Sequence, residues 1–200
     1  MTDRQRSQII CMADEPPYLG QNCVTPYPRR DVILRILWNV VQSTLFRWSP
    51  RPWHWFRAWL LRLFGADIQH VSRVVIFPTV RVALPWNLRL ADRAMIGPGV
   101  RLYNLGTISV GRGANISQYC HLCAGTHDYA AWSMPLVTRP IILEENCWLG
   151  TEVFVGPGVT VGELAVVGAR SVVVRDLPPR KICVGHPCRA VKDRLPPRKG

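Results

Sequence analysis

The chain has 200 residues, 48% of them hydrophobic, and a formal net charge of +12 at pH 7. This length is enough for one domain with its own core, and the apolar fraction excludes a wholly disordered chain. The excess of cations favours anionic partners such as phosphates or an acidic membrane face, although an ordinary basic surface has the same composition. No zinc-finger, RNP or basic-heptad motif is present, so we expect no nucleic-acid partner.

Neither a membrane span nor a secretion signal is predicted. Arg35, Arg57 and Arg62 interrupt the best apolar runs before they reach transmembrane length. The first residues, MTDRQRSQII, lack the long apolar stretch of a signal peptide. The seven cysteines follow no obvious disulfide spacing, so we expect reduced thiols and a cytoplasmic protein. Residues 1–28 form a polar, proline-bearing leader to which we assign no structure.

Residues 29–66 are predicted to form a helical annex rich in tryptophan and arginine. Apolar residues recur at helical spacing after Asp31, a plausible N-cap, and a second apolar stretch ends at Gly65, a plausible C′ residue. Two roles compete for this annex. Its helices would cover the open end of the domain that follows, or residues 31–65 would make a peripheral contact with the inner face of a membrane.

A six-residue repeat runs through residues 67–178. From Leu143 to Val173 every sixth residue is aliphatic, and the fourth residue after each is small or aliphatic. The same repeat runs upstream from Leu90 to Leu102, where two extra residues shift the register. Glycine often follows the aliphatic residue, where we expect turn geometries that a β-carbon would hinder. A period of six fits a short strand plus a turn, so we predict an all-β solenoid of parallel coils with inward aliphatic side chains.

The hexads resemble the left-handed parallel β-helix of the hexapeptide-repeat acyltransferases. The stretches ISQYCHLCAGTHDY, FVGPGVTVG and GHPCRAV resemble, more closely, the colanic acid biosynthesis acetyltransferase branch, near the galactoside and maltose O-acetyltransferases. The resemblance runs from about Arg29 to Arg194. It implies three hexads per coil, acetyl-CoA as acyl donor and no metal. It also implies a homotrimer with active sites between subunits, and a sugar or lipid-linked sugar of exopolysaccharide biosynthesis as acceptor.

The repeat is interrupted after His127, and a loop is predicted over residues 128–142. A sugar hydroxyl is a poor nucleophile until its proton is being removed, and histidine is the side chain whose pKa suits that task near neutral pH. The resemblance implies that His127 is this general base. The alternative is a loop histidine that only caps a turn. Asp128 is expected to orient the imidazole or to contact the acceptor, although a backbone carbonyl would orient the ring equally well.

The resemblance also implies acceptor and cofactor contacts. Asn104 in LYNLG matches an asparagine that contacts the acceptor, but at the register shift it would equally serve a turn. The positions that match cofactor contacts lie towards the C-terminus: Thr151, Ala169, Val174, Arg175, Arg189 and Lys192. The last three basic side chains would meet the phosphates of coenzyme A, whereas Ala169 and Val174 would act through their backbone. The alternative for the basic tail, residues 179–200, is a solvated surface.

Other functions are weighed against this one. Cys120 and Cys123 have the spacing of a zinc motif, but no second pair of ligands follows, and we interpret Cys120 as core filling. A cysteine nucleophile would give a two-step transfer. His121 and His127 lie six residues apart, which raises the alternative of a metalloenzyme resembling the γ-class carbonic anhydrases, but the sequence identifies no third ligand and lacks the long C-terminal helix of that class. A non-catalytic solenoid scaffold that binds a sugar or coenzyme A is the other alternative.

Overall fold

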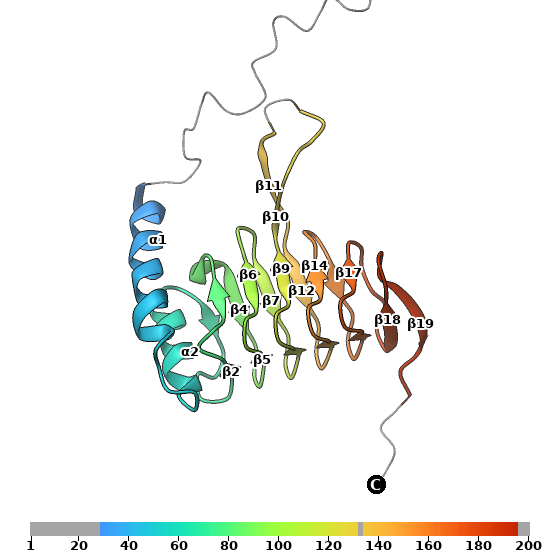
Figure 1. Cartoon of the computed structure of the whole chain (residues 1–200), viewed down its shortest axis with the longest axis horizontal. Coiled ribbons are helices and arrows are strands. Elements are labelled where there is room, and N and C mark those ends of the chain that lie inside the picture. Colours follow the sequence, from blue (N-terminus) through green and yellow to red (C-terminus); the bar gives the residue numbers. More distant parts are fainter. Residues whose placement is uncertain (1–28, 132–133, 196–200) are drawn as a thin grey trace, which may run out of the picture.

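The computed structural model describes residues 29–131 and 134–195. The predicted leader, residues 1–28, and the end of the predicted tail lie outside the described residues. Figure 1 shows a solenoid with helices at its N-terminal end and a hairpin that projects from its side. No helix in the described part of the chain has the length and hydropathy needed to cross a membrane.

Three sheets, named A, B and C in the order in which each coil meets them, form the walls of the solenoid (Figure 1). Sheet A has five strands: β1 (Asp67–Ile68), β4 (Leu88–Leu90), β7 (Ile108–Val110), β12 (Ile141–Leu143) and β15 (Thr160–Val161). Sheet B has seven: β2 (Val75–Ile76), β5 (Met95–Ile96), β8 (Asn115–Ile116), β13 (Trp148–Leu149), β16 (Val166–Val167), β18 (Lys181–Val184) and β19 (Arg189–Asp193). Sheet C has five: β3 (Arg81–Val82), β6 (Arg101–Tyr103), β9 (His121–Cys123), β14 (Phe154–Val155) and β17 (Val172–Val173).

The predicted left-handed parallel β-helix is confirmed. The hexad determines which side chains of its walls point inwards and which point outwards. Leu143, Leu149 and Val155 are consecutive inward residues of sheets A, B and C, and each is at most 1% exposed. A short strand can point only one side chain of each pair inwards, so the aliphatic ladders meet in a single core along the axis. Burial of apolar surface stabilises the fold by roughly 25 cal/mol per Å². One coil cannot bury its own apolar face, so several coils must stack to form the core.

Glycine follows the inward residues for a different reason from the one expected. Gly150 and Gly162 do not have positive φ. A β-carbon on Gly150 would lie 2.8 Å from the Ala169 amide nitrogen, and one on Gly162 would lie 2.5 Å from the Pro179 nitrogen. The next coil therefore approaches too closely for any side chain. Left-handed geometry falls instead on residues such as Glu152, with φ 57°.

The annex contains α1 (Arg29–Val41), a π-helical turn η2 (Gln42–Phe46) and α2 (His54–Leu63). It covers the first coil: the Trp38 indole Nε1 donates to the Val82 carbonyl at 2.7 Å, and the Gln42 side chain accepts from the Val82 amide at 2.6 Å. These bonds pair a strand edge that would otherwise be open, and the annex therefore covers the first coil, as the predicted capping role requires. Asp31 lies in the first turn of α1 rather than before it, because the helix already includes Arg29.

The end of α2 is formed as the sequence predicts. Gly65 has φ +94°, and its amide donates to the Arg62 carbonyl at 3.0 Å. The following amide, of Ala66, donates to the Leu61 carbonyl at 3.0 Å. This paired arrangement is the Schellman motif, which satisfies the last carbonyls of a helix. The chain is thereby turned into β1.

Arg57 of α2 is fully buried, although it was expected only as a charge that interrupts an apolar run. Its Nε donates to the Ile76 carbonyl at 2.7 Å, and its terminal nitrogens donate to Ser49 Oγ at 2.7 Å and to the Arg51 carbonyl at 2.6 Å. The guanidinium thus joins α2, the loop before it and β2 of the first coil. A planar donor with several N–H groups is suited to carbonyls that converge from different directions.

The C-terminal boundary differs from the prediction. Residues 179–200 were expected to form a tail, but β18 pairs in parallel with β16 and β19 pairs in antiparallel fashion with β18. Sheet B therefore continues to Asp193. Cys183 of β18 and Cys188, just before β19, are buried and help to close the core at its end.

The interruption after His127 is a hairpin rather than an irregular loop. Strands β10 (Gly125–His127) and β11 (Leu136–Thr138) pair in antiparallel register, with His127 opposite Leu136. The solenoid resumes at Ile141, two residues earlier than the hexads indicated, because Ile141 pairs with Ile108 of the previous coil. The predicted loop, residues 128–142, therefore contains β11 and the first two residues of β12.

Candidate active site

His127 lies at the end of β10, on an element that leaves the solenoid at the corner between sheets C and A (Figure 1). Only Ala124 separates β9, which belongs to the wall, from β10. The side chain of His127 is exposed in the single chain. A rigid wall with a projecting strand is a general way to hold a reactive side chain beside a groove.

The imidazole of His127 is oriented by a backbone carbonyl. Its Nδ1 lies 2.6 Å from the carbonyl oxygen of Met134. A carbonyl can only accept, so Nδ1 carries the proton and Nε2 keeps a free lone pair. Met134 itself has φ 41°, a left-handed backbone that turns the carbonyl towards the ring. The sequence gives no signal for this partner, because any residue at position 134 would supply the same carbonyl.

Asp128 has a different partner from the one proposed. Its Oδ1 accepts from the amide of Ala130 at 3.0 Å, which is an Asx turn. The carboxylate therefore holds the backbone just after β10. The expected alternative, a backbone carbonyl that orients His127, is the arrangement observed. A contact between Asp128 and an acceptor stays a prediction.

Asn104 is fully buried at the corner between β6 and β7. Its Oδ1 accepts from the amides of Ala83 and Leu84 at 3.1 and 3.0 Å, and its Nδ2 donates to the Leu84 carbonyl at 2.5 Å. The side chain thus ties its own coil to the preceding one at the register shift. This geometry supports the turn role for Asn104, and its contact with an acceptor stays a prediction.

The proposed cofactor residues lie in three places. Thr151 and Ala169 follow β13 and β16, at the corner between sheets B and C, and the Arg170 amide donates to the Thr151 carbonyl at 2.8 Å. Val174 and Arg175 follow β17, at the corner between sheets C and A from which the hairpin also leaves.

The last two proposed cofactor residues, Arg189 and Lys192, lie on β19 at the end of sheet B. One chain therefore gathers Val174 and Arg175 on the corner of His127, but holds Thr151 and Ala169 across the width of sheet C. Arg175, Arg189 and Lys192 are all exposed. These positions are open to a phosphate-bearing ligand along the C-terminal half of the solenoid.

The cysteines of the wall are buried thiols. Cys120 donates to the Gly150 carbonyl at 3.0 Å, and burial raises its pKa to about 11. Burial likewise raises the pKa of Cys147 to about 12. Such thiols are protonated near neutral pH and are poor nucleophiles. The interpretation of Cys120 as core filling agrees with its complete burial.

His121 and His127 lie on different elements. His121 points outwards from β9, with its ring 5.7 Å from the ring of Phe154 in an edge-to-face arrangement. Burial and then the charge of Arg101 lower its pKa. Among the residues that the structure describes, no group of three or more histidine, cysteine, aspartate or glutamate side chains is placed to hold a metal ion.

Comparisons with known proteins identify relatives of this architecture. No family model matches the chain. It is 47% identical over 159 residues to the "Putative colanic acid biosynthesis acetyltransferase WcaF" of Escherichia coli strain K12, covering 80% of this chain and 86% of that protein.

Solved structures share the fold. A maltose O-acetyltransferase of Clostridium difficile 630 superposes with a TM-score of 0.74 at 23% identity, covering 84% of this chain and 90% of that one. A hexapeptide-repeat acetyltransferase of Vibrio cholerae O1 biovar eltor, complexed with acetyl-coenzyme A, gives a TM-score of 0.75 at 23% identity, covering 84% of this chain and 91% of that one. From the fold and the extent of the identity with the E. coli relative, the chain belongs to the family of the colanic acid biosynthesis acetyltransferases.

Proposed function

We propose that this acetyltransferase moves an acetyl group from acetyl-CoA to a sugar hydroxyl by direct transfer, with His127 as the general base. The observation that carries the proposal is the bond from His127 Nδ1 to the Met134 carbonyl, since it leaves Nε2 of the neutral ring free to accept a proton on an exposed side chain. Acetyl-CoA is supported as donor by the family and by the acetyl-coenzyme A complex of the Vibrio cholerae protein with the same fold.

The chemistry follows from that tautomer. Nε2 of His127 takes the proton of the acceptor hydroxyl while the hydroxyl oxygen attacks the thioester carbonyl carbon. Backbone amides beside the bound thioester would stabilise the negative charge that forms on its carbonyl oxygen. As the carbon–sulfur bond breaks, the departing thiolate receives the proton from the imidazolium. The acetyl ester and the free thiol of coenzyme A are released, and the histidine returns to its starting state.

The division of the cofactor residues between corners supports a site shared by subunits. Val174 and Arg175 lie on the corner of the hairpin, whereas Thr151 and Ala169 lie across sheet C. Two such corners would face each other if neighbouring solenoids stood side by side around a common axis. A homotrimer with three clefts satisfies this requirement, and each cleft would receive one corner from each of two chains.

Release of coenzyme A thiol from acetyl-CoA, measured with a panel of sugars, tests the role of His127. We expect the His127→Ala variant to lose at least about a hundredfold in rate. His70→Ala is the matched control, because His70 is an exposed histidine on a different corner that pairs with Asp92. If His127→Ala keeps most of the wild-type rate, the proposed base is wrong.

Direct transfer has its own test. Incubation with acetyl-CoA alone should leave the intact mass of the protein unchanged, because no acetyl-enzyme forms. The high pKa of the buried thiols Cys120 and Cys147 supports this expectation. A mass increase of one acetyl group on a cysteine would contradict direct transfer and support a two-step route. Binding of acetyl-CoA without turnover on any acceptor would instead support the scaffold alternative.

The acceptor we propose is a sugar of exopolysaccharide biosynthesis, free or lipid-linked, and the annex supports a peripheral membrane contact. Trp48 and Trp55 are 82% and 54% exposed, and the neighbouring Arg47 and Arg51 are exposed cations. Tryptophan with arginine is typical of surfaces at the membrane interface.

Point variants test this contact better than deletion of the annex, which would uncover the first coil. Trp48→Ala with Trp55→Ala should lower sedimentation with vesicles that contain anionic lipid. Trp148→Ala, an exposed tryptophan of sheet B at 46%, should not. Equal vesicle binding by the double variant and the control would exclude the annex as the contact.

A further inference from the structure

A groove of about 430 Å³ lies between α1 and the outer face of sheet C, on the N-terminal side of the hairpin. Four basic side chains line it: Arg35 of α1, Arg81 of β3, Arg101 of β6 and His121 of β9. Tyr103 and Cys123 complete the wall nearest the hairpin. No carboxylate lines this groove among the residues that the structure describes.

The register of sheet C stacks three of these side chains directly above one another. Arg81 pairs with Arg101, and Arg101 pairs with His121, on three consecutive coils. Neighbouring strands lie about 4.8 Å apart, and like charges at that spacing repel each other. The arrangement therefore disfavours a protonated His121, in accord with the lowering of its pKa to which Arg101 contributes.

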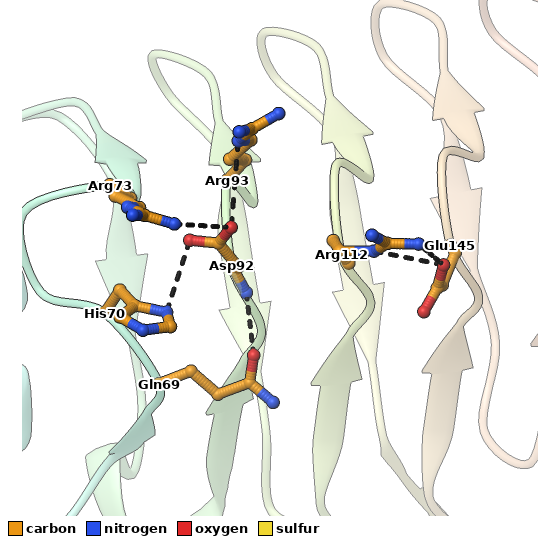
Figure 2. A network of polar contacts seen from close by, with 7 residues as sticks. All are labelled: Gln69, His70, Arg73, Asp92, Arg93, Arg112 and Glu145. Atoms are coloured by element: carbon orange, nitrogen blue, oxygen red, sulfur yellow. Dashed lines mark hydrogen bonds and ion pairs between the residues drawn. The ribbon is translucent and has the colours of Figure 1, made fainter.

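Four arginines elsewhere on the solenoid have carboxylate partners: Arg73, Arg93, Arg112 and Arg170. Figure 2 shows the corner between sheets A and B, where Arg73 and Arg93 lie 3.3 and 3.7 Å from Asp92. On the following coils, Arg112 lies 2.7 Å from Glu145 (Figure 2).

Arg81 and Arg101 differ from these arginines, since neither guanidinium has an ion pair within the described part of the chain. Arg81 and Arg101 thus place two positive charges side by side on one face of the groove. A bound anion would lower the repulsion between them.

The groove ends close to the proposed catalytic base. Cys123 is the last residue of β9, and His127 follows four residues later. An extended chain spans at most about 3.6 Å per residue, so their Cα atoms are separated by no more than about 14 Å. A ligand whose anionic group lies on the arginines can therefore extend past Tyr103 towards the hairpin.

We infer that this groove binds the phosphate of the acceptor, so that the sugar accepts the acetyl group while it is carried on a phosphate or diphosphate ester. Guanidinium groups bind phosphate oxygens through two parallel hydrogen bonds, and stacked guanidiniums suit a diphosphate better than a single charge. The exposed ring of Tyr103 would then lie against the sugar. This inference rests on the proposed function for the identity of the acceptor, but not for the binding of phosphate.

Inorganic pyrophosphate is the probe that tests phosphate binding separately from the identity of the acceptor. It is titrated into protein saturated with coenzyme A, which occupies its own phosphate contacts, and the heat of binding is measured. We expect the double variant Arg81→Gln, Arg101→Gln to bind pyrophosphate at least about tenfold more weakly, because charge-assisted hydrogen bonds are lost. The matched control Arg73→Gln, Arg112→Gln removes the same charge from the corner in Figure 2 and should bind like wild type.

Acetyl transfer then distinguishes the two sources of the diphosphate. The KM values for a uridine diphosphate hexose and for an undecaprenyl diphosphate hexose are compared in wild type and the double variant, with a methyl hexoside as neutral acceptor. A rise in KM for either diphosphate acceptor, with no rise for the methyl hexoside, supports the inference and identifies the source. An equal KM for every acceptor in both proteins would overturn it.

Two further outcomes would also overturn the inference. Pyrophosphate that binds equally to wild type and to the double variant places the phosphate elsewhere. Dissociation of the wild-type oligomer by the double substitution, seen by light scattering, would mean that the arginines meet a neighbouring subunit. Failure of the proposed function is recognised separately, since a protein without any acetyl transfer would still show the difference in pyrophosphate binding.

Discussion

The solenoid wall and the hairpin of β10 and β11 adjoin each other in the chain, yet they use their side chains differently. In the wall, Leu143 and Leu149 are buried completely in a core that every coil shares. In the hairpin, Thr126, His127 and Asp128 are all exposed. Stability therefore depends on the repeated wall, whereas the proposed chemistry depends on a segment that contributes little to the core.

The largest effect is expected from a change in the wall. Leu143→Ala removes a side chain that is 1% exposed, and it should lower the free energy of unfolding by about 3 kcal/mol. Ile142→Ala, the neighbouring outward residue of the same strand at 42% exposure, should cost less than about 1 kcal/mol. Urea unfolding measures both. Similar losses for the two variants would refute the assignment of the inward face.

The hairpin should give the opposite pattern. His127→Ala is expected to lower the rate of acetyl transfer about a hundredfold, which corresponds to about 2.7 kcal/mol in the barrier. Its free energy of unfolding should remain within about 0.5 kcal/mol of wild type, because the side chain is exposed. A large loss of stability together with activity would show that the hairpin is part of the core.

Asn104 lies in the wall, and a variant tests whether its side chain serves only the turn or also contacts the acceptor. Asn104→Ala leaves the amides of Ala83 and Leu84 without their acceptor, and should destabilise the protein by about 2 kcal/mol. The decisive measurement is the KM for the acceptor at a temperature where the variant is folded. A KM close to wild type supports the turn role, whereas a tenfold rise would establish the acceptor contact implied by the resemblance.

The buried thiols predict a dependence on pH. Because the pKa of Cys120 is raised to about 11 and that of Cys147 to about 12, the folded protein holds protons that the unfolded chain releases from about pH 8.5 upwards. Stability should be unaffected by these groups below that pH, and should fall by roughly 1–2 kcal/mol per thiol by pH 10. Thermal unfolding of wild type against Cys120→Ala measures the difference. Identical pH curves would contradict the prediction.

The smallest effect is expected from Asp128. Since its carboxylate holds the Ala130 amide rather than the imidazole, Asp128→Ala should change the rate of acetyl transfer by no more than about threefold. Asp128→Asn retains an oxygen for the same turn and should be closer still to wild type. A loss comparable to that of His127→Ala would show that the carboxylate acts on the ring or the acceptor during the reaction.

Local patterns were sufficient to predict the wall and the C-terminal end of the annex. The hexad specifies which side chain of each short strand points inwards, and this depends only on the alternation of a strand and the stacking of coils. Gly65 could be placed for a similar reason, because a helix end needs a residue that tolerates positive φ. The family resemblance located His127, but it did not identify the partner of the ring.

Residue spacing along the chain was enough to predict the solenoid, the helical annex before it and the position of the interruption. The tertiary structure alone decided three things: the carbonyl of Met134 on the imidazole, the burial of Arg57, and the stack of Arg81 on Arg101. Each joins residues that are distant in sequence or acts through a backbone atom common to every residue type. No local pattern encodes such a contact, because it exists only once the coils are in register.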